Sequence, residues 1–184
     1  MHDSVLKWAN ETLTSRHVQD RRVIEVGSYN VNGSIAPIIE ALEPAEYLGI
    51  DIEAGPGVDQ VRELAGGSIW LGTFGLVVCT EVMEHVVDWK ASLLDLVSLV
   101  ALDGHLLITT RSPGFPYHPY PIDTWRYTTD ALASAMQWLG MIVEHLTPDP
   151  DPASPGVFLL ARKPTRRIEL MEHVAGVTPM TERG

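Results

Sequence analysis

Acidic and glycine residues near the N-terminus have the types and spacing that bind a nucleoside. The apolar run RVIEV (22–26) contains Glu25 and leads into a polar loop, GSYNVNGS, that begins at Gly27. A glycine there lets the backbone turn sharply and approach a ligand closely. Asp51 ends the next apolar run at about the spacing (~20 residues) where an acid accepts hydrogen bonds from both hydroxyls of a ribose. The pattern predicts a nucleoside site, and a solvated acid at a strand end is the alternative interpretation of Asp51.

The loop lacks two of the glycines that a dinucleotide requires. In the pattern G-x-G-x-x-G the second glycine lets the backbone meet a diphosphate, but Tyr29 and Asn32 occupy the second and third glycine positions here. A cofactor without phosphates also suits a chain with 13 basic and 24 acidic residues and a net charge of −11. The sequence therefore favours such a cofactor over NAD.

A second polar and aromatic stretch, TTRSPGFPYHPYPIDTWRYT (109–128), follows a predicted strand at the same end of the sheet. We expect it to cover the acceptor of a reaction, with contacts from Arg111, Tyr117, His118, Asp123 and Arg126. With an unperturbed pKa of about 6.5, His118 is the candidate general base. Asp123 either orients His118 or pairs with Arg126. The alternative is a proline-stiffened lid whose aromatic rings pack on the sheet.

The apolar pattern alternates between strand-like and helix-like segments. Strands are predicted at RVIEV (22–26), EYLGID (46–51), VDQV (58–61), FGLVVC (74–79), HLLITT (105–110), MIVEHL (141–146) and VFLLAR (157–162). Helices are predicted at about 4–13, 35–42, 89–100 and 132–139. Asp88 and Thr128 are the expected N-caps of the last two helices, and Gly104 and Gly140 are their expected ends.

Two features of the strands predict their arrangement. Runs such as FGLVVC are apolar throughout, which is typical of a parallel sheet with helices on both faces. The last two strands are joined by TPDPDPASPG, which is too short for a crossover helix, so we expect an antiparallel hairpin at the sheet edge. The prediction is a doubly wound, mostly parallel, seven-stranded α/β sheet of the Rossmann-like type. It forms a single domain (1–184) with a core (20–162) and a tail (163–184).

Composition excludes several classes of partner. The chain is 45% hydrophobic and 20% charged, and its apolar runs are shorter than the roughly 20 residues that span a membrane. The N-terminus shows no secretory signal pattern, so we expect a cytoplasmic protein. The single Cys79 excludes an intramolecular disulfide and a cysteine-rich metal cage, and we expect no metal. The acidic net charge argues against nucleic acid or anionic membranes as partners.

In order and spacing, four stretches resemble the class I S-adenosylmethionine-dependent methyltransferases, particularly the small methyltransferase type 11 group. They are VIEVGS, YLGID, FGLVVCTEVMEHVVDW and LVALDGHLLITTRSP, and the resemblance covers about residues 20–162. It implies S-adenosylmethionine as the cofactor and methyl transfer as the activity. A small-molecule or glycan acceptor is favoured over a large folded target.

The resemblance implies roles for residues of the first two strands. Glu25 and Gly27 would hold the methionine end of the cofactor, directly or through water, with the backbone near Ser28 alongside. Asp51 would bind the ribose hydroxyls, and Ile52 would pack on the adenine.

Further roles follow for residues after the third and fourth strands. Glu63 would accept a hydrogen bond from the adenine amino group, Thr80 and Glu81 would line the sulfonium pocket, and His85 would lie near the methyl-transfer face. Each has a structural alternative: Glu63 is simply exposed, and Glu84 with His85 only caps and solvates the next helix.

Three functions therefore compete. The leading hypothesis is a small methyltransferase. The second is a non-catalytic S-adenosylmethionine-binding regulator or assembly protein, because the same cofactor residues serve both. The third, an NAD-linked oxidoreductase, is disfavoured by Tyr29 and by the terminal hairpin. A homodimer through the tail is an option that the sequence leaves open.

Overall fold

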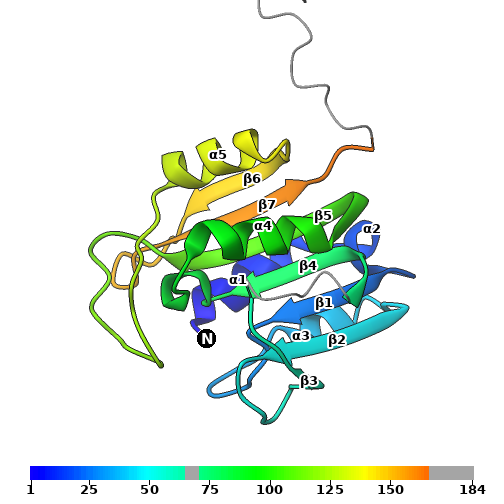
Figure 1. Cartoon of the computed structure of the whole chain (residues 1–184), viewed down its shortest axis with the longest axis horizontal. Coiled ribbons are helices and arrows are strands. Elements are labelled where there is room, and N and C mark those ends of the chain that lie inside the picture. Colours follow the sequence, from blue (N-terminus) through cyan, green and yellow to red (C-terminus); the bar gives the residue numbers. More distant parts are fainter. Residues whose placement is uncertain (65–70, 166–184) are drawn as a thin grey trace, which may run out of the picture.

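A seven-stranded sheet with the order β3-β2-β1-β4-β5-β7-β6 forms the centre of the molecule (Figure 1). The computed structural model describes residues 1–64 and 71–165, so most of the predicted tail (163–184) lies outside the described residues. The strands are β1 (Arg22–Val26), β2 (Glu46–Asp51), β3 (Gln60–Val61), β4 (Phe74–Thr80), β5 (Val100–Arg111), β6 (Ile142–Pro148) and β7 (Gly156–Arg162). The helices are α1 (Asp3–Thr12), α2 (Ser15–Val18), α3 (Ala36–Glu40), α4 (Trp89–Leu99), α5 (Thr129–Trp138) and the 3₁₀ helix η2 (Met83–His85).

Strands β1 to β5 run parallel to one another, whereas β7 runs antiparallel to both of its neighbours, β5 and β6. This arrangement confirms the doubly wound, mostly parallel sheet and the terminal antiparallel hairpin. None of the helices in the described part of the chain is long and apolar enough to cross a membrane.

Helix ends follow the predicted caps with one exception. Asp88 accepts hydrogen bonds from two backbone N–H groups of α4, Thr128 accepts one from α5, and Gly140 has a φ of +71° just after α5. The prediction that Gly104 ends the preceding helix is wrong, because α4 ends at Leu99 and the chain enters β5 directly. Gly104 lies within β5, where a Cβ would come 2.9 Å from the carbonyl oxygen of Ala101.

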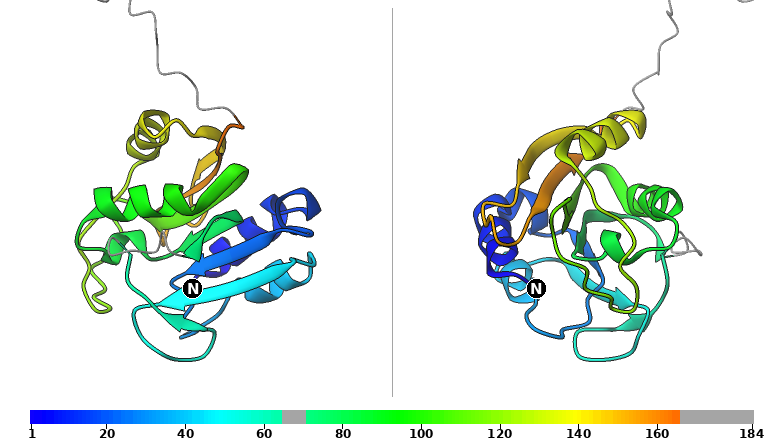
Figure 2. Two further views of the ribbon diagram at one scale, coloured as in Figure 1. Left: turned by 45° about the vertical axis from the view of Figure 1, so that its right-hand side comes forward. Right: turned by 90° about the vertical axis from the view of Figure 1, so that its left-hand side faces the viewer.

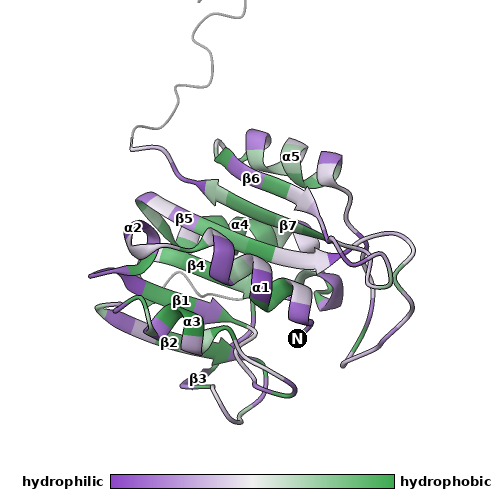
Figure 3. Ribbon diagram, turned by 180° about the vertical axis from the view of Figure 1, so that it is seen from behind, coloured by the Kyte–Doolittle hydropathy of each residue, from purple (hydrophilic) through white to green (hydrophobic). Residues whose placement is uncertain are grey.

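Helices cover both faces of the sheet (Figure 2). One layer packs Ala9 of α1 and Ile39 of α3 against strand residues such as Val23. The other packs Leu96 of α4 and Met136 of α5 against the opposite face. The central strands are therefore apolar along their length, as seen from behind in Figure 3. The polar residues that follow β1, β2, β4 and β5 meet at one end of the sheet.

Candidate active site

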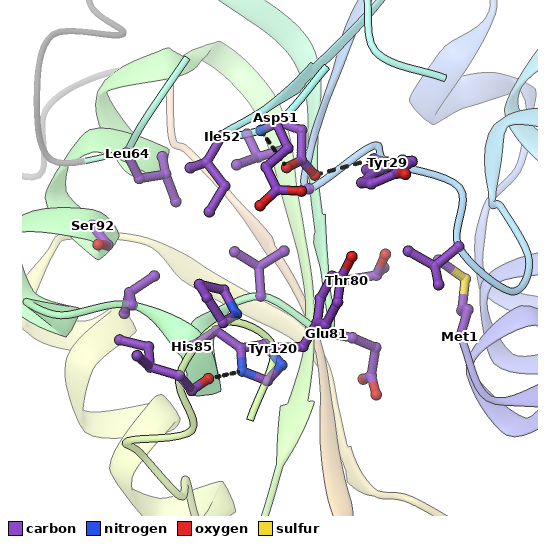
Figure 4. Close-up of a pocket in the computed structure, with 18 of the residues that line it drawn as sticks. Met1, Tyr29, Asp51, Ile52, Leu64, Thr80, Glu81, His85, Ser92 and Tyr120 are labelled. Carbon is purple, nitrogen blue, oxygen red and sulfur yellow. Dashed lines mark hydrogen bonds between the residues drawn. The ribbon is translucent and has the colours of Figure 1, made fainter. Parts of the chain in front are cut away.

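A cavity of about 780 Å³ lies at the carboxyl ends of the parallel strands. Volumes of about 300–1,000 Å³ are typical of small-molecule and cofactor sites, which in α/β sheets occur at this end. Many residues singled out in the sequence line it, namely Gly27, Asp51, Ile52, Glu63, Thr80, Glu81, His85 and His118. In Figure 4, Asp51 and Tyr29 lie on one side of the cavity, and His85 and Tyr120 lie on the other.

Gly27 and Asp51 form the end of the cavity nearest β1 and β2. Gly27 has a φ of +80°, and a Cβ on it would overlap the side chain of Val82, so only glycine keeps this turn tight. The carboxylate of Asp51 accepts one hydrogen bond from the backbone N–H of Tyr29 (3.1 Å) and one from that of Glu53 (3.1 Å). Each oxygen keeps a second lone pair, so the fixed carboxylate can accept from two further hydroxyls.

Ile52, Glu63 and Leu64 form an adjoining wall of the cavity. The side chain of Ile52 is about half exposed (49%), and it presents an apolar surface to the cavity. A flat heterocycle could pack on the apolar side chains of this wall, with the carboxylate of Glu63 at the edge of the heterocycle.

Thr80 and Glu81 follow directly from β4 at the centre of the cavity. Among the described residues, the buried hydroxyl of Thr80 has no hydrogen-bond partner, so it is available to a ligand. Glu81 has a φ of +59° and accepts a hydrogen bond from the hydroxyl of Thr109 (3.0 Å). Its second oxygen forms an ion pair with Arg111, so the carboxylate is fixed in position.

The loop between β5 and α5 (112–128) is fastened to the segment after β4. Trp125 donates from its indole N–H to the carbonyl of Val86 (2.9 Å), and Tyr127 donates from its hydroxyl to the carbonyl of Met83 (2.9 Å). The carbonyl of Glu84 accepts from the backbone N–H groups of Thr124 and Trp125. The two chain segments therefore form one rigid wall.

His85 and His118 meet on this wall. Their ring centroids lie 5.0 Å apart, and the ring of His118 also packs edge-on against Phe115, with centroids 4.8 Å apart. The Nδ1 atom of His85 is hydrogen-bonded to the carbonyl of Ile122 (Figure 4). The carboxylate of Glu84 lies behind them, 3.8 Å from Nε2 of His85.

Two residues predicted at the methionine end lie outside the cavity lining. Glu25 is buried in β1 and accepts a hydrogen bond from the hydroxyl of Tyr47. Burial raises the pKa of Glu25 to about 7, and the Tyr47 hydrogen bond opposes this rise. The hydroxyl of Ser28 is buried where a Cβ on Gly49 would touch it. Binding of the methionine end of the cofactor by Glu25 and by the backbone near Ser28 remains a prediction from the sequence.

Four residues predicted to contact the acceptor also lie outside the lining. Arg111 is fully buried and reaches Asp149 (3.4 Å) and the carbonyl of Ser154 (3.1 Å) in the turn before β7. The side chain of Tyr117 is mostly exposed (72%).

Asp123 and Arg126 form an ion pair, which is one of the two arrangements predicted for Asp123. Arg126 holds the pKa of Asp123 below its usual range. Arg126 also donates to the carbonyl of Pro116 (3.1 Å), so the pair holds the loop in shape.

Other lining residues had no assigned role in the sequence. Tyr120, Pro121 and Ile122 come from the loop, whereas Met1 and His2 come from the start of the chain. Only the aromatic and proline content of the loop hinted at the first three.

The glycine turn after β1 and the acid at the end of β2 lie at the carboxyl ends of parallel strands, where α/β proteins bind nucleosides and nucleotides. Over residues 4–147 the sequence matches the methyltransferase domain family, and the chain belongs to that family. A comparison with curated proteins gave no match.

Solved methyltransferases share the fold. One is the 1,6-didemethyltoxoflavin-N1-methyltransferase of Burkholderia thailandensis, solved with S-adenosylhomocysteine (TM-score 0.70, 13% identity, 86% of this chain and 78% of that chain). Another is the magnesium protoporphyrin IX methyltransferase of Synechocystis, solved with S-adenosylmethionine (TM-score 0.56, 15% identity, 88% of this chain and 77% of that chain). A third is an N-methyltransferase of Bradyrhizobium japonicum (TM-score 0.64, 13% identity, 88% of this chain and 93% of that chain).

These findings confirm the family, the fold class and the enzyme class that the sequence predicted. The ligands bound in two of the neighbours agree with the predicted cofactor.

Proposed function

We propose that this protein transfers a methyl group from S-adenosylmethionine to a small-molecule or sugar acceptor. The observation that carries the proposal is the Asp51 carboxylate, which is fixed by two backbone N–H groups and has lone pairs free toward the cavity. Gly27, Asp51 and Ile52 are where a nucleoside needs a close backbone, a paired acceptor and an apolar surface.

The residues present fit this cofactor along the whole cavity. Asp51 would accept from the ribose hydroxyls, Ile52 would pack on the adenine, and Glu63 would accept from its amino group. Thr80, whose hydroxyl lacks a partner, and Glu81 would face the methionine end.

Positioning is the main contribution of the protein. S-adenosylmethionine supplies a methyl group on a positively charged sulfur and so carries its own activation. Fixed alignment of donor and acceptor contributes up to about 7–11 kcal/mol in well-oriented systems. The rigid wall that bears His85 and His118 stands opposite Asp51 and would hold the acceptor.

The size of the acceptor follows from the enclosure of the cavity. The loop residues Phe115, Tyr120 and Ile122 line it on one side, and Met1 with His2 lines it near the start of the chain. A cavity of about 780 Å³ that must also hold the cofactor favours a compact acceptor. His118 as general base stays a prediction from the sequence.

Calorimetric titration with S-adenosylhomocysteine tests the cofactor site. Asp51→Ala should weaken binding by roughly 2–3 kcal/mol, the value of charge-assisted hydrogen bonds. The matched control is Glu46→Ala, which removes a carboxylate from the other end of β2, where Glu46 pairs with Arg22. Equal affinities of Asp51→Ala and wild type would contradict the assignment.

A second experiment separates catalysis from binding alone. Incubation with a methyl-labelled donor and a metabolite extract should label a small molecule or sugar. Binding of S-adenosylhomocysteine without any labelled product would favour the regulator hypothesis.

A further inference from the structure

Three side chains on the rigid wall carry the donor atoms of a metal site. Glu84, His85 and His118 each offer one ligand atom, and these atoms all lie within 4.8 Å of one another. Two imidazoles and a carboxylate form a set that binds divalent transition metals and leaves coordination positions open. We call these three residues the acceptor-side cluster.

His85 is oriented as a ligand. A carbonyl oxygen can only accept, so the hydrogen bond to Ile122 shows that Nδ1 of His85 carries the proton. Nε2 therefore keeps its lone pair, and it faces Oε1 of Glu84 at 3.8 Å. Metal-binding histidines usually donate their other N–H to a carbonyl or carboxylate in this way.

Glu84 supplies a buried oxygen that lacks a partner. Its side chain is fully buried, and Oε2 accepts a hydrogen bond from the hydroxyl of Thr110 (2.7 Å), but Oε1 has no hydrogen-bond partner in the described part of the chain. Oε1 of Glu84 and Nε2 of His85 therefore present lone pairs to each other in a buried site, and this arrangement favours a positive charge between them.

His118 brings the third donor from the loop. Its backbone N–H donates to Asp123 (2.8 Å), which is itself paired with Arg126, and its ring rests against Phe115. The guanidinium of Arg126 is thus engaged by Asp123. Ligand atoms of a tetrahedral site lie about 3.3–3.6 Å apart when bonds are about 2.0–2.2 Å long, so small side-chain rotations would close the cluster.

We propose that Glu84, His85 and His118 bind one divalent transition-metal cation on the acceptor side of the cavity. Both imidazoles line the cavity, so open coordination positions would face the acceptor. A cation lowers the pKa of a hydroxyl that it binds, which favours an oxygen acceptor. His118 is then a ligand and not the general base. The role of the cation in activating an acceptor rests on the proposed methyltransferase function, whereas binding of the cation does not.

The test is a titration of the metal-free protein with Co²⁺, followed by its visible absorption and by competition with Zn²⁺. Wild type should bind one equivalent. His118→Asn, and independently His85→Ala, should weaken binding at least about tenfold. S-adenosylhomocysteine affinity should stay within about twofold in both variants, which shows that the fold and the cofactor end are intact.

A matched control comes from a second group of the same residue types, His17, His105 and Glu144, which we call the sheet-end cluster. His17→Asn should leave Co²⁺ affinity within about twofold. Absence of stoichiometric binding in wild type, or loss of binding in His17→Asn with retention in His118→Asn, would overturn the proposal. Co²⁺ binding without S-adenosylhomocysteine binding would overturn the proposed function and leave the metal site standing.

Discussion

The acceptor-side and sheet-end clusters contain the same three residue types but differ in what engages their lone pairs. In the sheet-end cluster, Nε2 of His17 accepts from Arg16 (2.9 Å). Glu144 accepts from Arg16 (3.1 Å) and from Arg162 (3.1 Å). Guanidinium groups therefore already neutralise this carboxylate, and a metal ion would have to displace them.

In the described part of the chain, no guanidinium group is hydrogen-bonded to the carboxylate of the acceptor-side cluster, Glu84. Oε1 of Glu84 is buried without a hydrogen-bond partner within residues 1–64 and 71–165, and both neighbouring imidazoles line the cavity. The sheet-end cluster lies where β5 and β6 begin, at the opposite end of the sheet. The comparison teaches that ligand composition alone does not define a metal site, because the neighbours decide whether lone pairs are available.

The largest contrast is expected from neutralising each carboxylate in turn. Glu84→Gln should lower Co²⁺ affinity at least about 100-fold and change the free energy of unfolding by less than about 0.5 kcal/mol, because a glutamine still accepts from Thr110. Glu144→Gln should leave Co²⁺ affinity unchanged but destabilise by up to about 1 kcal/mol, since Arg16 and Arg162 each lose an ion pair with Glu144, although Arg162 keeps its pair with Asp103. Urea denaturation and Co²⁺ titration measure both effects. Equal Co²⁺ affinities in the two variants would remove the distinction between the clusters.

A smaller contrast between the clusters is expected in the pH dependence of protein stability, to which the sheet-end cluster contributes through His17. Burial, His105 and Arg16 lower the pKa of His17 to about 4, and Glu144 opposes this shift while Arg21 adds to it. Because the unfolded state binds the proton more tightly, the contribution of neutral His17 is complete above about pH 6.5 and is lost as the pH falls toward 4. Stability should fall by on the order of 2 kcal/mol between pH 7.5 and pH 5.

Urea denaturation at the two pH values measures this loss, and His17→Gln is the control that lacks the titrating group. If the free energy of unfolding falls equally between the two pH values in wild type and in His17→Gln, the pH dependence comes from other groups.

The smallest effect is expected from Arg16→Ala. Arg16 is largely exposed, so its ion pair with Glu144 contributes little to stability. Removal of the Arg16 side chain frees the lone pair on Nε2 of His17 and a lone pair on Oε2 of Glu144. The substitution also removes a positive charge that lowers the pKa of His17. We expect the pKa of His17 to rise and a second Co²⁺ event to appear, at least about tenfold weaker than the first. NMR titration of the imidazole checks the pKa, and an unchanged value would show that Arg16 is not what protects this cluster.

The sheet was predictable because its signals are local. Runs such as FGLVVC in β4 are buried on both faces, and the short connection before β7 allows only a hairpin. Asp51 was predictable for the same reason, since a strand-end acid after a glycine turn is a short-range pattern. The start of β5 was missed because Gly104 was taken as a helix end, whereas its position is set by close contact with the backbone of β4.

The wall of the acceptor side could not be predicted in the same way. Arg111 seemed to be a substrate contact, but its partners Asp149 and Ser154 come from a turn far along the chain. His118 lies beside His85 only because the loop is fastened to η2 by Trp125 and Tyr127. Such pairings depend on tertiary structure, and no spacing in the sequence reports them.

The loop between β5 and α5 leaves and re-enters the fold at one point. Ser112 donates from its hydroxyl to the carbonyl of Tyr127 (2.8 Å), and Tyr127 donates from its backbone to the carbonyl of Arg111 (2.9 Å). Since this clasp fixes the two ends, and the loop is next fastened to the segment after β4 at Ile122, the number of residues between Ser112 and Ile122 should have little effect on the sheet. Doubling the length of such an excursion costs only about 0.6 kcal/mol of closure entropy. The clasp therefore marks two junctions, at residues 111–112 and 127, for grafting this loop between relatives.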